Sequence, residues 1–303
     1  MKYFMIAPMH DVDSLTAHVI GEIWQPKNID HRVLEYGGEP EPFRDLSEKG
    51  DQNIVMADFG YSGSPTALEM VDKLEKLRIA GTKIDMYDQH NWKDAQSRAF
   101  NTYTHSSDIS SAEIMSLNLV RNNPLAMYLA KIATREDYGR YDDETGKLTD
   151  LVNSHISKDE LIRELATLSD PRLILSISAE IELEKYRKYL KPEAESKLKD
   201  SVTKHQTPLG NFRIGLAPEL LYMKPGHRYL RDHNSNDNTL CFFENHNNIL
   251  FRTKTGEQAK TILGIFDGDG RGTEGGFDPG EVVTEANYAR VRDKILEKIR
   301  TLD

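Results

Sequence analysis

Short apolar runs alternate with longer stretches of helical periodicity through the first third of the chain. Apolar residues at helical spacing predict helices over 14–24 and 65–79. The apolar runs between them predict four strands: Lys2–Ala7, Arg32–Tyr36, Asn53–Phe59 and Lys83–Tyr87. Strands that alternate with helices form βαβ units, in which the strands lie parallel. The sequence therefore predicts an α/β fold whose N-terminal part is a parallel sheet between two helical layers, an αβα domain.

The rest of the chain predicts a linker helix and a smaller C-terminal α/β domain. Helices are expected over 110–136, with a break at Asn123-Pro124, and after the capping-box sequence Ser157–Glu160. A long charged helix is expected to start near Pro171 and to run to Tyr189, or past Pro192 to Lys204. The elements expected beyond it are strands over 211–217, 239–244 and 248–253, a helix over 256–266, a glycine-rich stretch at 268–280 and a helix over 285–302. The resulting division is 1–169 for the first domain, 170–206 for the linker helix and 207–303 for the second domain.

Charge restricts the partners of the chain. Its 303 residues include 39 Lys and Arg against 49 Asp and Glu, which gives a formal net charge of −10. Non-specific binding to long nucleic acids depends on neutralising phosphates, so a chain this acidic is poorly suited to it. Short phosphate-bearing molecules remain possible partners where metal ions or a local basic patch supply positive charge.

Composition also restricts the class of protein. No apolar run approaches the ~18 residues of a transmembrane helix, so no membrane partner is expected. The apolar stretch at the N-terminus is only a few residues long and acids follow it, which does not match a signal peptide. Cys241 is the single cysteine, which excludes an internal disulfide and a cysteine-based zinc site. We therefore expect a cytoplasmic protein.

Acidic residues follow three of the predicted strands. Asp11 and Asp13 come after the first strand, Asp58 ends the third, and Asp88 and His90 follow the fourth. The carboxyl ends of parallel strands meet at one edge of a sheet, so these side chains should lie close together. Carboxylates held together repel one another unless a cation lies among them, and oxygen ligands with one or two imidazoles suit Mg²⁺ or Mn²⁺. The alternative is that each acid only caps the following helix, with Asp13 or Ser14 as the cap of the first.

Three motifs in this order resemble those of the DHH phosphoesterase superfamily. They are His10-Asp11-Val12-Asp13, then Asp58 in Met56-Ala57-Asp58-Phe59, then Asp88-Gln89-His90. The C-terminal half is similar to the substrate-binding domain associated with this superfamily, through Leu250-Phe251-Arg252-Thr253 and the glycine-rich Gly272–Pro279. The two-domain form with these motifs is similar to nano-RNases, RecJ-type exonucleases and cyclic dinucleotide phosphodiesterases.

This resemblance implies hydrolysis of phosphoesters with two metal ions, commonly Mn²⁺. It implies that Asp11 and Asp58 hold one ion, and that Asp13, Asp58 and a later acid hold the other. Asp137 is the best candidate for that acid, with Asp142 and Asp143 as rivals. His10 and Gln89 stand at or beside further metal-ligand positions of the motifs. The resemblance further implies that His90 and Asp88 are catalytic residues, with His90 in contact with the substrate phosphate. It also implies that Arg252, Gly275 and Gly276 bind the substrate.

The chain departs from the family pattern at several positions. Gln89 stands where the family has a metal-binding histidine, and Phe277 stands where the glycine loop has one. His105 is a possible replacement for the missing imidazole, although His105 and His18 are expected to be surface or capping residues. The basic run Tyr222–His233 is either a phosphate contact or a solvated loop. For Arg252 the alternative to a phosphate contact is a salt bridge at the rim.

The combined features predict a phosphodiesterase. Its substrates would be short single-stranded oligonucleotides or small, including cyclic, nucleotides, cleaved to 5′-monophosphates, and a homodimer is possible. A second interpretation is a catalytically weakened binding scaffold for nucleic acid or protein, which Gln89 favours. A third is an unrelated doubly wound protein in which the acids are helix caps.

Overall fold

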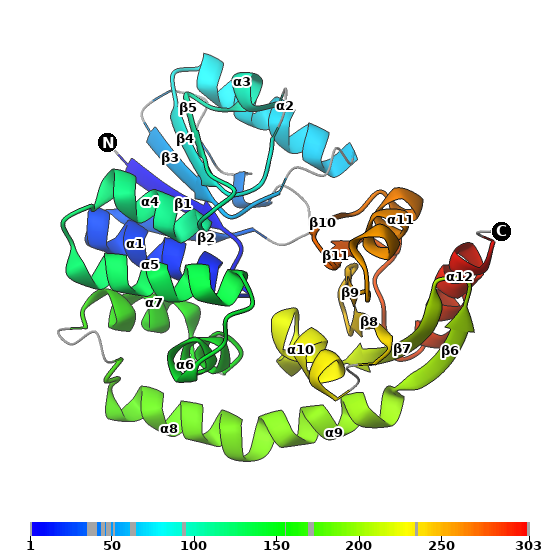
Figure 1. The fold of residues 1–303 in the computed structure, drawn as a ribbon. Coiled ribbons are helices and arrows are strands. Elements are labelled where there is room, and N and C mark those ends of the chain that lie inside the picture. Colours follow the sequence, from blue (N-terminus) through cyan, green and yellow to red (C-terminus); the bar gives the residue numbers. More distant parts are fainter. Residues whose placement is uncertain are drawn as a thin grey trace. The chain divides into compact units, whose positions relative to one another are not determined.

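The chain forms two compact units, Met1–Leu183 and Glu184–Asp303, each of which has its own sheet (Figure 1). The computed structural model describes residues 2–34, 41–43, 46, 50, 52–60, 65–92, 95–154, 156–168, 173–233 and 236–301. The division between the units falls within the long helical segment that the sequence predicts as a linker. The predicted domain boundary at 169–170 and the predicted helix start near Pro171 lie outside the described residues.

The first unit contains a parallel sheet of five strands. They are β1 (Lys2–Ala7), β2 (Ile29–Val33), β3 (Gln52–Ala57), β4 (Lys83–Asp88) and β5 (Thr102–His105), in the order β2-β1-β3-β4-β5. The predicted αβα arrangement is confirmed. The second strand begins three residues earlier than predicted, and β5 was not predicted because its sequence, TYTH, has no apolar alternation. The order of the strands reverses between β1 and β3, and ligands of open α/β sheets bind at the carboxyl ends beside such a switch point.

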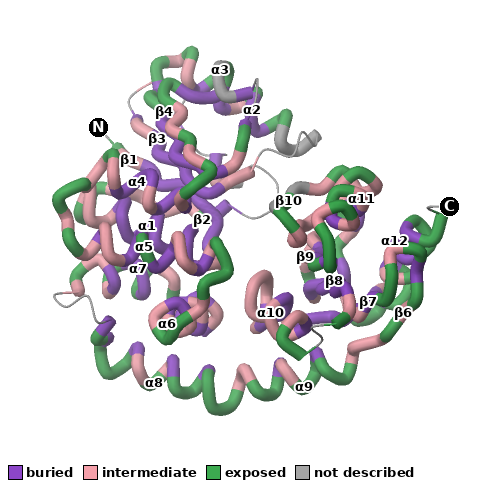
Figure 2. Tube along the Cα trace, in the orientation of Figure 1, coloured by how far each residue is buried: buried purple, intermediate pink, exposed green. Residues whose placement is uncertain are grey.

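Alternating side chains of the strands divide the interior of this unit into two cores. The central strands β1 and β3 are mostly buried (Figure 2). Met5 and Ala7 of β1 belong to one core, and Phe4 and Ile6 belong to the other. The first core is closed by α1 (Val12–Trp24), α4 (Ser111–Leu119), α5 (Pro124–Asp137), α6 (Asp143–Val152) and α7 (Lys158–Ala166). The second is closed by α2 (Pro65–Ile79) and α3 (Gln96–Ala99), beside the short helical turn η1 (Glu41–Phe43).

Local sequence explains where several helices begin. Asp11 caps α1 through a reciprocal capping box with Ser14, and Asn123 caps α5 with Pro124 at its first position. The predicted capping box at Ser157 is wrong. The helix α7 starts there, but the Ser157 side chain forms no capping hydrogen bond.

A continuous helical segment, α8 (Ile177–Lys185), a π-helical turn (Tyr186–Leu190) and α9 (Lys191–Ser201), passes from the first unit into the second. Pro192 cannot donate the backbone bond of a regular helix, and it stands in the first turn of α9, directly after the π-helical turn. The predicted continuation past Pro192 is confirmed, but the helix ends at Ser201 and not at Lys204, because Thr203–Thr207 form the strand β6. None of the described helices combines the length and apolar character that crossing a membrane requires.

The second unit is built on a mixed sheet of six strands. After β6 come β7 (Gly210–Ala217), β8 (Asn238–Phe243), β9 (Ile249–Arg252), β10 (Asp269–Arg271) and β11 (Glu274–Phe277), in the order β10-β11-β9-β8-β7-β6. Only β7 and β8 are parallel among the described pairs. The helix that connects them is α10 (Lys224–Asp232), preceded by the turn η4 (Glu219–Leu221). The basic run was not predicted to be helical, so its interpretation as a loop is wrong.

Two helical layers cover the sheet of the second unit. One core joins inward side chains of the sheet, such as Phe242 and Phe251, to α11 (Gly256–Phe266) and α12 (Tyr288–Arg300). The other core joins Cys241 and Phe243 of β8 to α9 and α10. Cys241 is completely buried on a strand, as expected.

His18 is buried inside the first unit, which corrects the expectation of a surface or capping residue. Its Nε2 lies 3.2 Å from the carbonyl oxygen of Ala7, and its Nδ1 lies 3.1 Å from Nδ1 of His31. Burial, together with the smaller effect of the neighbouring His31, lowers the pKa of His18 to about 3. His18 is therefore neutral at every pH at which the protein is expected to function.

This neutral histidine predicts acid sensitivity. The unfolded chain binds a proton at His18 below about pH 6.5, whereas the folded chain does not until about pH 3. The free energy of unfolding therefore decreases as the pH is lowered through this window. Between pH 7 and pH 5 the loss of unfolding free energy from His18 should be about 2 kcal/mol. Urea unfolding of the wild type and of His18→Gln at both pH values measures the difference. An equal pH dependence of the unfolding free energy in the two proteins would contradict the conclusion that His18 is neutral in the folded state.

Candidate metal centre

The acids expected at the strand ends converge at the carboxyl edge of the first sheet. Asp11 and Asp13 follow β1, Asp58 follows β3, and Asp88 ends β4. The N-termini of α1 and α4 meet the same edge, because Asp11 caps α1 and Asp13 receives hydrogen bonds from the first turn of α4. Backbone N–H groups at helix N-termini stabilise negative charge.

Asp13 is held by the backbone of α4. The residue is completely buried, its Oδ2 accepts a hydrogen bond from Ser111 N at 2.9 Å, and its Oδ1 accepts one from Ala112 N at 2.8 Å. Asp11 accepts a bond from Ser14 N at 2.9 Å. The cap of α1 is therefore Asp11, and the predicted cap at Asp13 or Ser14 is wrong. Capping of α1 uses one oxygen of Asp11, and it does not explain why Asp13 is buried beside it.

Asp58 has the most unusual environment of these residues. Its backbone adopts a left-handed conformation, with φ of 54°, which an L-residue other than glycine seldom occupies and which recurs at functional sites. Its Oδ1 accepts a bond from Gln89 Nε2 at 3.0 Å. Its Oδ2 is buried and has no hydrogen-bond partner among the residues that the structure describes. A buried carboxylate oxygen without a donor is costly unless another positive group approaches it.

The electrostatics show that Asp137 belongs to the same group. Burial raises the pKa of Asp13 to about 8, and the nearby charges of Asp137 and Asp11 contribute to the rise. Burial raises the pKa of Asp58 well above its usual range, followed by the charges of Asp11, Asp13, Asp88 and Asp137. Asp142 instead caps α6 and pairs with Arg135, and Asp143 is exposed.

These four acids, Asp11, Asp13, Asp58 and Asp137, are called the acid cluster below. Their mutual repulsion and the unpartnered Oδ2 of Asp58 fit a divalent cation better than they fit four protonated carboxyls. Oxygen donors of this kind suit hard cations such as Mg²⁺ and Mn²⁺. His10 is partly buried in the loop that carries Asp11, adjacent to the cluster in sequence.

Asp88 differs from Asp58 because both of its oxygens receive hydrogen bonds. Oδ1 accepts from His90 N at 3.0 Å and from His90 Nδ1 at 2.7 Å, and Oδ2 accepts from Trp92 Nε1 at 2.9 Å. Burial alone would raise the pKa of Asp88, but His90 and the hydrogen bonds, including that from Trp92, lower it below its usual value. Ionised Asp88 is therefore a positioning residue that fixes the ring of His90.

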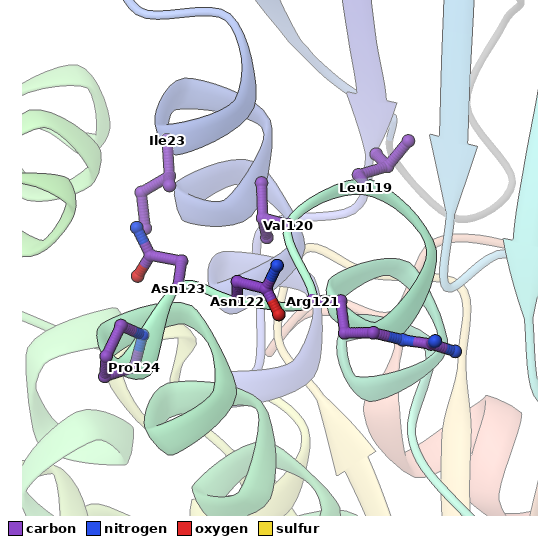
Figure 3. Close-up of a pocket in the computed structure, with 7 residues that line it drawn as sticks. All are labelled: Ile23, Leu119, Val120, Arg121, Asn122, Asn123 and Pro124. Atoms are coloured by element: carbon purple, nitrogen blue, oxygen red, sulfur yellow. The ribbon is translucent and has the colours of Figure 1, made fainter.

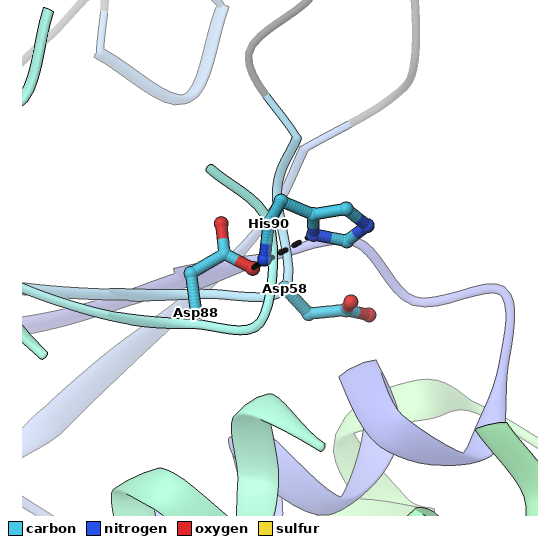
Figure 4. A group of neighbouring side chains, drawn as sticks. All are labelled: Asp58, Asp88 and His90. Carbon is cyan, nitrogen blue, oxygen red and sulfur yellow. Dashed lines mark hydrogen bonds and ion pairs between the residues drawn. The ribbon is translucent and has the colours of Figure 1, made fainter. Parts of the chain in front are cut away.

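Ligand atoms of Asp58, Asp88 and His90 lie within 4.8 Å of one another (Figure 4). This spacing would admit a metal ion, but Nδ1 of His90 already faces Asp88. Nε2 is the ring nitrogen of His90 on the far side of the ring from Asp88 (Figure 4). His90 is accessible enough to meet a ligand, with 26% of its side chain exposed.

Gln89 turns its amide NH₂ group, not its oxygen, toward Asp58. The amide oxygen of Gln89 accepts a hydrogen bond from the hydroxyl of Ser111, which also contacts Asp88 and accepts a bond from Asp58 N. An NH₂ group is a donor and cannot bind a cation, so a metal role for Gln89 requires the amide to rotate. His105 is exposed, and its Nε2 contacts the backbone oxygen of Gln89 at 3.2 Å.

Ser111 and Trp92 are site residues that were not predicted. The sequence places Ser111 at the start of a helix, where serine is common as a cap. No feature of the sequence indicates that it contacts the acids at three strand ends. Trp92 follows the third motif by two residues and is completely buried. A buried indole N–H needs a hydrogen-bond acceptor, and this requirement is the only feature of the sequence that suggests a contact between Trp92 and a nearby acid such as Asp88.

The residues expected to bind substrate lie in the second unit. Arg252 ends β9, and its Nε lies 3.7 Å from Oε1 of Glu274, as in the salt-bridge alternative. Gly275 and Gly276 belong to β11 and pair with Phe251 and Leu250 of β9. Phe277, at the position of the family histidine, is buried and stacks on Phe266.

A surface depression in the first unit lies away from the acid cluster (Figure 3). It is lined by Ile23, near the end of α1, and by residues 119–124, where α4 ends and α5 begins. The acid cluster meets the opposite ends of α1 and α4, and each of these helices is roughly 13–20 Å long at 1.5 Å per residue. No acid or histidine lines the depression, so it is not part of the candidate site.

Comparison with known proteins identifies the fold. No family model matches the chain, and no curated protein sequence matches it. The structure described as the DHH domain of a member of the s1p family of ribosomal proteins has a TM-score of 0.66 at 13% identity, over 100% of this chain and 87% of the other.

Two further structures have a TM-score of 0.50. One is an exopolyphosphatase-related protein from Bacteroides fragilis, at 13% identity over 99% of this chain and 93% of the other. The other is RecJ from Thermus thermophilus in complex with Mg²⁺, at 10% identity over 100% of this chain and 50% of the other. At these identities the likeness concerns the fold. The chain has the fold of the DHH-domain proteins, and the resemblance seen in its motifs is confirmed at that level.

The raised pKa of Asp13 predicts that cation binding depends on pH. Below about pH 8 a cation must displace the proton from this carboxyl, so the apparent affinity for Mn²⁺ should rise between pH 6.5 and 7.5. The rise should be up to about tenfold for one displaced proton. Titration calorimetry measures the affinity, with Asp58→Asn expected to weaken it and Asp142→Asn as the matched control. A pH-independent affinity, or one that Asp58→Asn leaves unchanged, would contradict the site.

Proposed function

We propose that the protein is a metal-dependent phosphoesterase that hydrolyses short single-stranded oligonucleotides or small nucleotides to 5′-monophosphates. The observation that carries this proposal is the acid cluster, with the raised pKa values of Asp13 and Asp58 and the unpartnered Oδ2 of Asp58 among the described residues. The proposal is supported by the common fold with DHH-domain proteins, among them RecJ, whose structure contains Mg²⁺.

The acid cluster has the donors for two cations that share Asp58. In this proposal Asp11 and Asp58 hold one ion, and Asp13, Asp58 and Asp137 hold the other, with His10 beside the first. Two such ions, when bound, supply an activated water and neutralise charge on the phosphate oxygens. The backbone of α4 and the Ser14 amide keep the carboxylates in place, so the protein need not reorganise when substrate arrives.

His90 would orient the phosphate. The ionised Asp88 accepts a hydrogen bond from Nδ1–H of His90, and this would direct Nε2 to a phosphate oxygen. Trp92 and Ser111 hold Asp88 in turn. Loss of the Asp88 carboxylate should therefore lower kcat through the position of His90 and leave metal binding largely unchanged.

The net charge of −10 favours short substrates over long polyanions. A short oligonucleotide carries few phosphates, and local cations can neutralise them. Arg252, Gly275 and Gly276 of the second unit are proposed to contribute to this binding.

One observation favours a second candidate, a binding scaffold with weakened catalysis. Gln89 gives Asp58 a hydrogen bond from its NH₂ group where the family has a metal-binding imidazole. This bond partly satisfies Asp58 and competes with a cation for the same oxygen. The two candidates differ in whether turnover occurs when metal is abundant.

Turnover of a dinucleotide in the presence of Mn²⁺ tests the proposed function. Asp58→Asn should lower kcat by about 10³-fold or more, because it removes the carboxylate that both ions would share. Asp142→Asn changes an exposed acid of the same type outside the cluster, so it should keep full activity. Metal binding without turnover would favour the scaffold, and full activity of Asp58→Asn would sink the assignment of the cluster.

Substitution of Gln89 by histidine tests whether the absent imidazole at this position weakens metal binding. If the amide only occupies an eroded ligand position, Gln89→His should lower the Mn²⁺ concentration at half-maximal activity. Gln89→Ala is the control, because it removes the hydrogen bond to Asp58 without adding an imidazole. A Gln89→His protein that is slower than the wild type, and no more sensitive to Mn²⁺, would show that the site needs no second imidazole.

A further inference from the structure

Within the second unit, His227 is a buried polar residue that the fold leaves unsatisfied. It lies in α10, is 8% exposed, and its Nε2 has no hydrogen-bond partner among the described residues. Burial, followed by the nearby cations Arg231 and Arg252, lowers the pKa of His227 to about 4. A neutral ring with an unmet nitrogen, set beside two guanidinium groups, is costly in a protein interior unless a ligand meets it.

Sheet register independently places Arg252 on the same face as His227. Ile249 and Phe251 of β9 point into the core beneath α11 and α12, whereas Leu250 packs against the core that contains α9 and α10. Side chains alternate along a strand, so Arg252 shares the face of Leu250. Gly276 pairs with Leu250 and therefore lies on this face too, where a Cβ would stand only 3.0 Å from Cδ2 of Leu250.

The helix α10 lies unusually close to this sheet. A Cβ at Gly226 would lie 2.6 Å from the Leu221 carbonyl oxygen and 2.7 Å from Cβ of Ala217, so only glycine fits there. This contact presses the first turn of α10 against the end of β7 and buries the next residue, His227. Arg231 lies four residues further along, on the same side of the helix.

The charges around His227 are mainly positive. Nε of Arg231 lies 2.8 Å from Oδ1 of Asp232, and Nε of Arg252 lies 3.7 Å from Oε1 of Glu274, so each guanidinium has an acidic neighbour near the surface. Asp232 is the one acid that raises the pKa of His227, against two cations that lower it. The group can therefore bind an anion whose oxygens take hydrogen bonds from planar guanidinium donors.

We propose that His227, Arg231 and Arg252 form a phosphate subsite on the α10 face of the second unit, which binds a phosphate group of the nucleotide. The inference rests on the proposed function for the identity of its ligand. It adds two residues of α10 to the arginine expected from the motifs. His227 acts as a recognition residue, because its Nε2 has no hydrogen-bond partner within the part of the chain that the structure describes.

Binding of adenosine 5′-monophosphate to the full chain in EDTA tests this subsite without the acid cluster. His227→Leu should weaken binding by roughly 10- to 100-fold, as expected for a lost hydrogen bond to a charged group. Arg231→Gln should weaken it similarly. Arg290→Gln removes a cation of α12, which packs against the opposite face, and should have no effect. Inorganic phosphate as a second probe should compete with the nucleotide.

A stability measurement separates recognition from a structural role. A purely structural histidine would lower the melting temperature when replaced, whereas removal of an unsatisfied buried nitrogen should leave it unchanged or raise it. Weaker nucleotide binding by His227→Leu at an undiminished melting temperature is the expected result. If His227→Leu does not fold, His227→Gln gives the binding result. Wild-type affinity in the His227 variant, or no binding to the wild type in EDTA, would overturn the subsite. Neither result depends on metal-dependent hydrolysis, which the dinucleotide assay judges separately.

Discussion

Repulsion among buried carboxylates is the constraint on which the candidate site depends. Asp13 and Asp58 are excluded from water, and each feels the charges of its acidic neighbours, so their pKa values rise. The fold nevertheless holds them together, because the first turn of α4 donates two backbone bonds to Asp13 and the left-handed backbone of Asp58 directs its side chain to the same edge. Such an arrangement is stable at neutral pH when a cation supplies the missing positive charge.

Residues of one chemical type have different roles here because their surroundings differ. Asp58 and Asp88 lie at the ends of neighbouring strands. At Asp88 the effect of burial is outweighed by the neighbouring His90 and by hydrogen bonds, which lower the pKa, whereas one oxygen of Asp58 has no donor among the described residues. Asp88 therefore orients the ring of His90, whereas Asp58 has the oxygen that we propose a cation meets. The second unit has a comparable arrangement with positive charge. Nε2 of His227 has no hydrogen-bond partner among the described residues and lies near Arg231 and Arg252.

Much of this could be predicted from the sequence, for a physical reason. Apolar runs such as Lys2–Ala7 mark buried strands, and the meeting of Asp11, Asp13 and Asp58 follows from parallel strand geometry alone. The role of Ser111 could not be predicted, because it depends on which strand ends the start of α4 approaches. The burial of His18 was missed because almost every residue of α1 is buried. Such a helix has no exposed polar face from which the sequence could show which side is buried. The helix α10 was missed because its buried residues, Gly226, His227 and Leu230, include only one strongly apolar side chain among basic neighbours. The sequence therefore shows no clear apolar periodicity there.

The most direct test of the central claim is the position of the metal itself. Crystals grown with MnCl₂ and measured above the manganese absorption edge would locate each bound ion by its anomalous scattering. The account predicts a peak within bonding distance of Oδ2 of Asp58, with further ligands from Asp11, Asp13 or Asp137. A map with no peak among these four acids, in crystals that hold Mn²⁺ elsewhere on the protein, would contradict it.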